Sequence, residues 1–382
     1  DATGQACTTA VTTLTTGTVT ATYNGEDECF LGSTGTVTVT VNEASTTTSV
    51  TATPDPSVCG QAVTICATVV ANPPGSGTPT GTVTFTSPSG LNQTVALDAS
   101  GQACTTAVTT LTTETVTATY NGEDACFLGS TGTVAITVNE ASTTTSVTAT
   151  PDPSVCGQAV TVCATVTAVA PGSGIPTGTV TFTGLGGPDQ TVTLDATGQA
   201  CTTAVTTLTS GTVTATYNGE DPCFLGSVGT TTVTVTEAST TTSVTATPDP
   251  SVCGQAVTVC ATVTAVAPGS GIPTGTVTFT GLGGPDQTVT LDATGQACTT
   301  AVTTLTTGTV TATYNGEDPC FLGSVGTTTV TVTEASTTTS VTATPDPSVC
   351  GQAVTVCATV TAVAPGSGIP TGTVTFTGLG GP

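Results

Sequence analysis

Four short segments, TVTVTV (36–41), AVTICATV (62–69), GTVTFT (81–86) and TVTATY (115–120), decide the fold of this 382-residue chain. In each of them Val, Ile, Ala or Phe alternates with residues that are mostly threonine. Apolar residues at every second position, many of them β-branched, are typical of half-buried β-strands. No segment has the i, i+3, i+4 apolar spacing of a helix, so the sequence predicts an all-β fold.

The chain repeats itself every 97 residues. Asp1, Asp98, Asp195 and Asp292 each open a near-copy of the passage DATGQACTTAVTTL. A unit of this length can bury its own core, whereas a solenoid repeat of roughly 20–45 residues depends on its neighbours. The sequence therefore predicts a tandem array of independent domains. They are expected at 44–140, 141–237 and 238–334, with the C-terminal half of a domain at 1–43 and the N-terminal half at 335–382.

Each unit is expected to fold as an immunoglobulin-like β-sandwich, because seven short antiparallel strands in roughly 100 residues describe that architecture. Aromatic residues make up only 3% of the chain, so disulfides are expected to compensate for a thin core. In 44–140 the strands are expected near 46–53, 62–70, 80–86, 93–97, 102–111, 114–121 and 132–139. Their inward residues would be Val63, Ile65, Ala67, Val69, Val83, Phe85, Leu97, Leu111, Val116, Ala118, Tyr120, Val134, Ile136 and Val138.

The composition excludes several classes of function. The chain has no Lys, Arg or His and carries a formal charge of -24. Nucleic acid is therefore not expected as a partner, since phosphate binding needs clustered basic residues. No apolar run approaches the roughly 18 residues of a membrane helix, so this segment is not expected to insert into a membrane. The chain has no His to act as a general base, no Lys to form a Schiff base and no Arg to bind an anion. No enzyme is therefore expected.

Sixteen cysteines recur four to a unit, which predicts disulfides and an extracellular or cell-surface location. Spacings such as C-x6-C do not fit a zinc site. In a sandwich of alternating strands, Cys66 faces outward beside Cys104, so these two residues are expected to bridge within the domain. Cys59 and Cys126 lie at opposite ends of one domain, too far apart for a bridge.

The remaining cysteines are therefore expected to join neighbouring domains, because stacking brings the bottom of one domain to the top of the next. The rival scheme is local, with Cys59 paired to Cys66 and Cys104 to Cys126. The staggered scheme places within-domain bridges at Cys66–Cys104, Cys163–Cys201 and Cys260–Cys298, and between-domain bridges at Cys59–Cys223 and Cys156–Cys320.

Acidic residues gather at the same junction. Asp55, Glu140, Glu220 and Asp221 are expected to approach one another from two domains, and carboxylates from both sides of a joint suit a calcium ion. The alternative is that these residues are solvated loop acids, with Asp55 serving a Pro-Asp-Pro turn. Calcium is the one cofactor that the sequence suggests.

The run TTTSVTATPDPSVCGQAVTICATV, then TPTGTVTF, then TVTATYNGED followed by Phe127, resembles the bacterial immunoglobulin-like repeats of giant surface proteins. The resemblance covers the whole chain and implies a stalk or fibre at the cell surface, without catalytic residues. The four cysteines per unit depart from the family pattern, so their pairing is not implied by it.

We expect a structural component of an extracellular filament or cell-surface stalk, with neighbouring repeats and other copies of the chain as its partners. An adhesin that binds a ligand is the alternative, although 141–237 and 238–334 differ only at Ser210 and Thr307, which disfavours variable binding loops. Pro382 would connect to Asp1 through the six residues 286–291, DQTVTL. A piece of a longer array is therefore expected, with completion of half-domains between copies by strand donation as the alternative.

Overall fold

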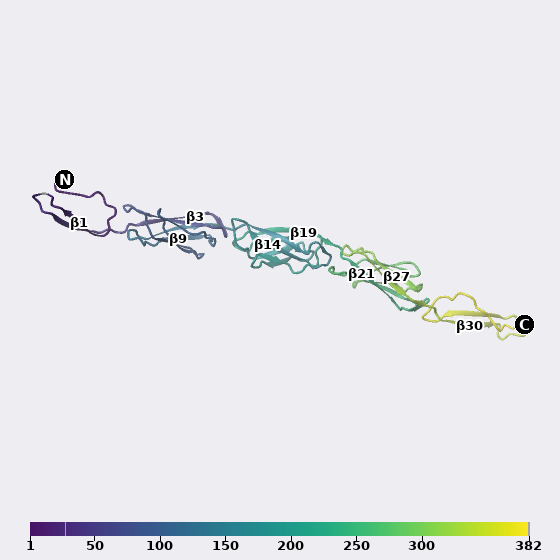
Figure 1. Cartoon of the computed structure of the whole chain (residues 1–382). Coiled ribbons are helices and arrows are strands. Elements are labelled where there is room, and N and C mark those ends of the chain that lie inside the picture. The colour runs from purple at the N-terminus through teal and green to yellow at the C-terminus, as the bar shows by residue number, and fades with distance from the viewer. Residues whose placement is uncertain (27, 381–382) are drawn as a thin grey trace.

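The computed structural model describes residues 1–26 and 28–380. Figure 1 shows an extended row of domains with the two termini at opposite ends. We call 44–140 domain 1, 141–237 domain 2 and 238–334 domain 3. Every regular element among the described residues is a β-strand, and none of those residues belongs to a helix long and apolar enough to cross a membrane.

Each complete domain is a sandwich of two antiparallel sheets. In domain 1 one sheet has the order β3-β5-β8 and the other β10-β9-β6-β7. A short third pairing, between β11 and β4, is parallel. The strands of domain 1 are β3 (Thr46–Thr53), β4 (Ser57–Val58), β5 (Thr64–Ala71), β6 (Thr82–Thr86), β7 (Asn92–Ala96), β8 (Gln102–Cys104), β9 (Glu114–Tyr120), β10 (Ser130–Ile136) and β11 (Val138–Asn139).

Domains 2 and 3 repeat this arrangement strand for strand. Domain 2 contains β12 (Thr143–Thr150), β13 (Ser154–Val155), β14 (Thr161–Ala168), β15 (Thr179–Thr183), β16 (Gln190–Thr193), β17 (Gln199–Cys201), β18 (Gly211–Tyr217), β19 (Ser227–Val233) and β20 (Val235–Thr236). Domain 3 contains β21 (Thr240–Thr247), β22 (Ser251–Val252), β23 (Thr258–Ala265), β24 (Thr276–Thr280), β25 (Gln287–Thr290), β26 (Gln296–Cys298), β27 (Gly308–Tyr314), β28 (Ser324–Val330) and β29 (Val332–Thr333).

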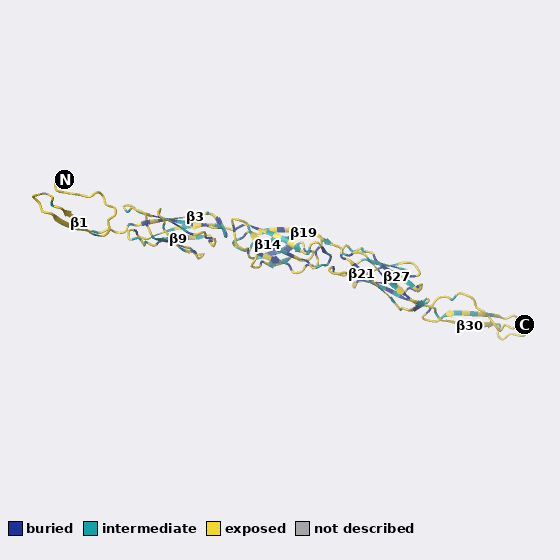
Figure 2. Ribbon diagram, in the orientation of Figure 1, coloured by how far each residue is buried: buried dark blue, intermediate teal, exposed yellow. Residues whose placement is uncertain are grey.

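The flanking segments each form a two-stranded antiparallel sheet. Strands β1 (Gly17–Tyr23) and β2 (Ser33–Val39) pair before domain 1, and β30 (Thr337–Thr344) pairs with β31 (Thr355–Ala362) after domain 3. Buried residues concentrate in the three complete domains, as Figure 2 shows, while the two flanking segments are mostly exposed.

The core of each domain lies between its two sheets and is built from aliphatic residues around two Phe and one Tyr. Eleven of the inward residues expected in domain 1 are buried, and Leu97, Val134 and Val138 are half-buried. Tyr120 is 1% exposed, and its hydroxyl donates a hydrogen bond to the Thr80 carbonyl at 2.7 Å. The pattern missed buried Leu91, Ala103, Val108 and Phe127, because these residues lie outside or at the ends of alternating runs.

Two expected strands of domain 1 end or break earlier than the alternation indicates. The strand expected at 102–111 stops at Cys104, where the Thr105 hydroxyl accepts a hydrogen bond from the Ile65 amide and the ladder ends. The strand expected at 132–139 is divided at Thr137, whose amide donates to the Asp55 carboxylate at 2.9 Å instead of to a neighbouring strand. This break lets β11 leave its sheet and pair in parallel with β4.

A glycine allows the two sheets to meet closely at one edge. In domain 2, a Cβ on Gly229 would lie 2.2 Å from the Thr145 carbonyl oxygen, so no larger residue fits without moving β12 away from β19. The neighbouring hydroxyls complete this edge, because the Thr143 Oγ1 donates to the Leu225 carbonyl and to the Ser227 Oγ, both at 2.7 Å. Gly132 and Gly326 make the same approach in domains 1 and 3.

Replacement of Gly229 by alanine is expected to destabilise domain 2 by about 1–3 kcal/mol, because the added methyl overpacks the contact with β12. Calorimetry of the whole chain would show domain 2 melting before its neighbours. Gly211→Ala is the matched control, since a Cβ at Gly211 meets nothing within 4 Å. Equal melting of the two variants would contradict the close approach.

Candidate functional site: the joints between domains

The most distinctive chemistry of the chain lies where one domain meets the next. Cys59 of domain 1 is bridged to Cys223 of domain 2, and Cys156 of domain 2 is bridged to Cys320 of domain 3. Both bridges have Cα–Cα distances of 5.4 Å and a sequence separation of 164 residues. Each joint therefore has two covalent links, one peptide connection and one disulfide.

The lower cysteine is positioned by the parallel pairing at the bottom of its domain. The Cys59 amide donates to the Asn139 carbonyl at 2.9 Å, at the end of the β4–β11 pairing. The side chain of Gln61 closes the turn by accepting a hydrogen bond from the Val58 amide at 3.0 Å. Because Asn139 is where the chain leaves domain 1, this pairing sets Cys59 beside the entrance to domain 2.

The upper cysteine lies in residues 218–226, between β18 and β19, which we call the upper loop. The Cys223 amide donates to Asp221 Oδ1 at 2.9 Å, and the Cys223 carbonyl accepts from the Ala141 amide at 2.8 Å. The next residue, Phe224, forms a parallel bridge with Ala141. The upper loop is thus held against the first residue of its own domain, directly above the joint.

Asp221 fastens the upper loop to the rest of domain 2. Burial alone would raise the pKa of this carboxyl, but hydrogen bonds from the Thr177 hydroxyl and from the Cys223 and Thr177 amides outweigh it and lower the pKa. In domain 3 the equivalent partners, Thr274 and Cys320, lower the pKa of Asp318 in the same way. The ionised form is therefore the one that holds the loop.

Hydrogen bonds across the joint reinforce the disulfide. The Ser173 amide of domain 2 donates to the Cys59 carbonyl at 3.3 Å, and its hydroxyl donates to the Gly60 carbonyl at 2.6 Å. Gly60 has φ +73°, and a Cβ there would lie 2.0 Å from the Ser173 carbonyl oxygen. Ser270 and Gly157 make the same contacts at the second joint.

Cys59 belongs to the core cluster of the following domain and not to that of its own. It is 7% exposed and packs in one apolar cluster with Ala141, Val160 and other residues of domain 2. Cys156 packs in the same way into domain 3. The bridge therefore ties domain 1 to the core of domain 2, with its Cys59 end buried and its Cys223 end half-buried.

The other bridges lie within domains. Cys66 and Cys104 are direct partners in the β5–β8 ladder and are bridged with a Cα–Cα distance of 4.1 Å. The staggered pairing expected from the sequence is thus the pairing that the structure has, and the local pairing of Cys59 with Cys66 is not formed. The corresponding within-domain bridges are Cys163–Cys201 and Cys260–Cys298.

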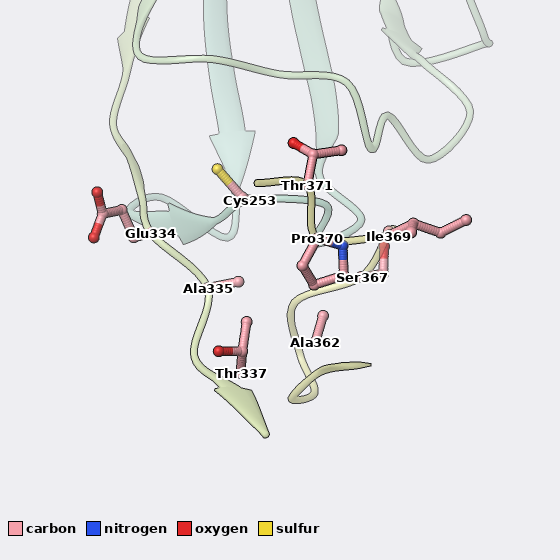
Figure 3. A pocket seen from close by; sticks show the side chains of 10 residues that line it. Cys253, Glu334, Ala335, Thr337, Ala362, Ser367, Ile369, Pro370 and Thr371 are labelled. Atoms are coloured by element: carbon pink, nitrogen blue, oxygen red, sulfur yellow. The ribbon is translucent and has the colours of Figure 1, made fainter. Parts of the chain in front are cut away.

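A cavity between Cys253 of domain 3 and the segment that follows this domain shows what the upper loop contributes to a joint. Figure 3 shows Cys253 with Ala335, Thr337, Ser367 and Pro370 around a cavity of about 510 Å³. Residues 335–380 contain no counterpart of the upper loop, and Cys253 is exposed there, whereas Cys59 and Cys156 are buried. The upper loop, with its Cys and Phe, is therefore what fills the joint and covers the lower cysteine.

The acidic residues expected to bind calcium are not brought together. Within residues 1–26 and 28–380, no three acidic or cysteine side chains form a metal-binding group. Asp55 accepts from the Thr137 amide, Glu220 from the Thr179 hydroxyl at 3.0 Å, and Asp221 from Thr177 and Cys223. Glu140 is exposed. Asp55, Glu220 and Asp221 thus accept hydrogen bonds within their own domains instead of forming one cluster across the joint.

Ser173 and Ala141 are joint residues that the sequence analysis missed. Both occur in every complete unit, but a serine in a Pro-Gly-Ser-Gly turn and an alanine after an acidic residue carry no chemical signal of their own. The cysteine spacing was the one informative feature, since it is the same in every unit.

Non-reducing peptide mapping tests the joint directly. Digestion with a protease of broad specificity is needed, because the chain has no Lys or Arg for trypsin and no acidic residue between Cys59 and Cys66. We expect one linked peptide pair containing Cys59 and Cys223, and another containing Cys156 and Cys320. Recovery of Cys59 linked to Cys66 would contradict the structure.

Replacement of Asp221 by asparagine is expected to lower the stability of domain 2 by about 1 kcal/mol at neutral pH, since the site is half-exposed and partly screened. Because the folded-state pKa is lowered, this contribution is present above the ordinary value of 3.8 and is lost as pH falls through the lowered pKa. Calorimetry of wild type and variant from pH 7 to pH 2 would show the difference shrinking. Asp189→Asn, at an exposed loop residue, is the control.

Comparison with known proteins gives a consistent family. The model of the bacterial Ig-like domain (group 3) matches residues 50–139, 147–236 and 244–333, one match in each complete domain. No curated protein matches the chain.

Several solved adhesin structures are similar in fold. A Ca²⁺-stabilised adhesin by which an Antarctic bacterium binds ice is 26% identical, covers 82% of this chain and 81% of its own, and has a TM-score of 0.27. The tetra-tandem repeat in the extending region of a large adhesion protein is 19% identical, with coverages of 83% and 81% and a TM-score of 0.34. The Escherichia coli adhesin FdeC is 19% identical, with coverages of 75% and 96% and a TM-score of 0.26.

The family assignment rests on the family model and on the sandwich itself. That model covers well over half of the chain, in three consecutive units. The chain is a tandem array of the bacterial Ig-like domain family (group 3).

Proposed function

We propose that this chain is a structural segment of an extracellular filament or cell-surface stalk, in which disulfide-bridged Ig-like domains set a fixed distance. The observation that carries the proposal is the repetition of one joint. Both joints have the same bridge geometry and the same serine contacts, at 3.3 Å and 2.6 Å. A repeated covalent joint serves length and stiffness, whereas a binding site needs to occur only once.

The bridges also support a location outside the cytoplasm. Five disulfides in one chain are stable in an oxidising compartment and are rare in the reducing cytoplasm. A charge of -24, with no cationic side chain, keeps such an array soluble and repels anionic surfaces. We place the protein at the cell surface or in the extracellular space.

Neighbouring repeats and other copies of the chain are the proposed partners. Each complete domain exposes the same apolar side chain, since Leu128, Leu225 and Leu322 are 46%, 44% and 44% exposed. Copies lying side by side would meet the same surface at every domain.

A ligand-binding role for the repeated domains is the alternative. Domains 2 and 3 differ at one position, Ser210 against Thr307, so they offer almost the same loops. Because the two domains present almost the same loops, a role in setting distance is favoured over a role in binding a ligand.

Deletion of one 97-residue unit from the protein in its own bacterium separates the two functions. Because the deletion preserves the cysteine register, a stalk is expected to lose one domain length in electron micrographs of intact, antibody-labelled cells, with surface attachment unchanged. Thr307→Ser, which makes domain 3 identical to domain 2 at this position, is the neutral control. Loss of attachment without a change in stalk length would favour the adhesin, and so would blocking of attachment by the purified chain. Antibody labelling that appears only after the cells are permeabilised would contradict the proposed surface location.

A further inference from the structure

We propose that the joint disulfides create continuous covalent routes along the array which bypass most of each sandwich, so that tension cannot unravel the domains. The inference deepens the proposed function, since it states how a stalk would resist pulling. It rests on which strands connect consecutive bridges, a property of the chain that can be measured without reference to its location.

One route begins at the first joint. From Cys59 the bridge crosses to Cys223, and the backbone then continues to Cys253. Four strands lie in this stretch, β19, β20, β21 and β22, with seven, two, eight and two residues. The first pair descends through domain 2 and the second pair through domain 3, so a stretch of about 30 residues spans two domains.

A second route is offset by one domain. The backbone from Cys126 to Cys156 passes through β10 and β11 of domain 1 and then through β12 and β13 of domain 2. The Cys156–Cys320 bridge carries it to domain 3, where β28 and β29 continue it. At each joint one route crosses by the peptide connection and the other by the disulfide.

Most of each domain lies off both routes. In domain 2 these residues are 157–222, which include β14 to β18 and the Cys163–Cys201 bridge. They form the greater part of the sandwich, yet no tension needs to pass through them. Their role in this arrangement is to enclose and align the two routes.

The two routes are also fastened to each other within a domain. At the upper end of domain 2 the Thr143 hydroxyl bonds to Leu225 and Ser227, at 2.7 Å each. At the lower end β13 pairs in parallel with β20, and the Cys156 amide donates to the Thr236 carbonyl at 2.9 Å. Both strands run in the same direction, so a pull along the array loads them together.

The routes have little slack in the folded state. A β-strand already rises 3.2–3.4 Å per residue, close to the limit of about 3.3–3.6 Å for a fully extended chain. A covalent route that consists largely of extended strands therefore cannot lengthen much, even if the rest of the domain unfolds.

Single-molecule pulling between Ser45 and Thr247 measures this limit. Handles attached through unnatural amino acids at these two exposed positions leave every thiol untouched. The route runs from Ser45 to Cys59, across the bridge, and from Cys223 to Thr247. It contains about 38 residues, so the chain is expected to extend to about 130 Å and then to resist further extension.

Cys59→Ser combined with Cys223→Ser removes the route. The shortest remaining covalent path between the handles runs through Cys66–Cys104, Cys156–Cys320 and Cys260–Cys298. It contains about 108 residues, so the chain is then free to extend to about 370 Å. Cys156→Ser combined with Cys320→Ser is the matched control, because that bridge lies outside this route, and it is expected to keep the limit of about 130 Å.

Reduction of the folded, tethered wild-type chain gives the same comparison if the double serine variant does not fold. We expect abrupt lengthening after reductant is added under tension. Extension of the intact chain well beyond about 130 Å, or an equal limit before and after reduction, would overturn the proposal. Either result would leave the surface-stalk function to its own test.

Discussion

The two-residue parallel pairing at the bottom of each domain is the constraint on which the array depends. In domain 1 it joins β4 to β11 and holds Cys59 beside the residue where the chain leaves the domain. Without this pairing, the lower cysteine would lie on a free loop with no fixed relation to the next domain. With it, the disulfide, the serine contacts and the shared apolar cluster can form in one defined geometry.

Period-two alternation was sufficient to predict the sandwich, most of its strands and the inward residues of β5, β6 and β9. The cysteine pairs also followed from which end of the sandwich each loop occupies. The break at Thr137 did not follow, because it depends on a hydrogen bond from the backbone to Asp55, far away in sequence. The calcium cluster was expected from proximity at a joint, but proximity does not reveal that Thr177, Thr179 and backbone amides already bond to those carboxylates.

The two copies of TTTSVTAT in β12 and β30 show how far local sequence determines burial. In β12, Thr143, Thr145, Val147 and Ala149 are buried or half-buried and alternate with exposed residues. Every residue of β30 is exposed. Both strands pair with an equivalent neighbour, β14 or β31, in the same register. The local sequence therefore specifies the strand and its partner, while the facing sheet decides what is buried.

The identity of the two joints has a geometric consequence. Because domains 2 and 3 are nearly the same in sequence and their joints repeat the same bridge and the same serine contacts, one rigid rotation and translation relates each domain to the next. Repeating a single head-to-tail operation that does not close on itself generates a screw axis. Each added repeat then advances the same helix by one step, so pitch and handedness are set at a single joint and are independent of how many repeats follow.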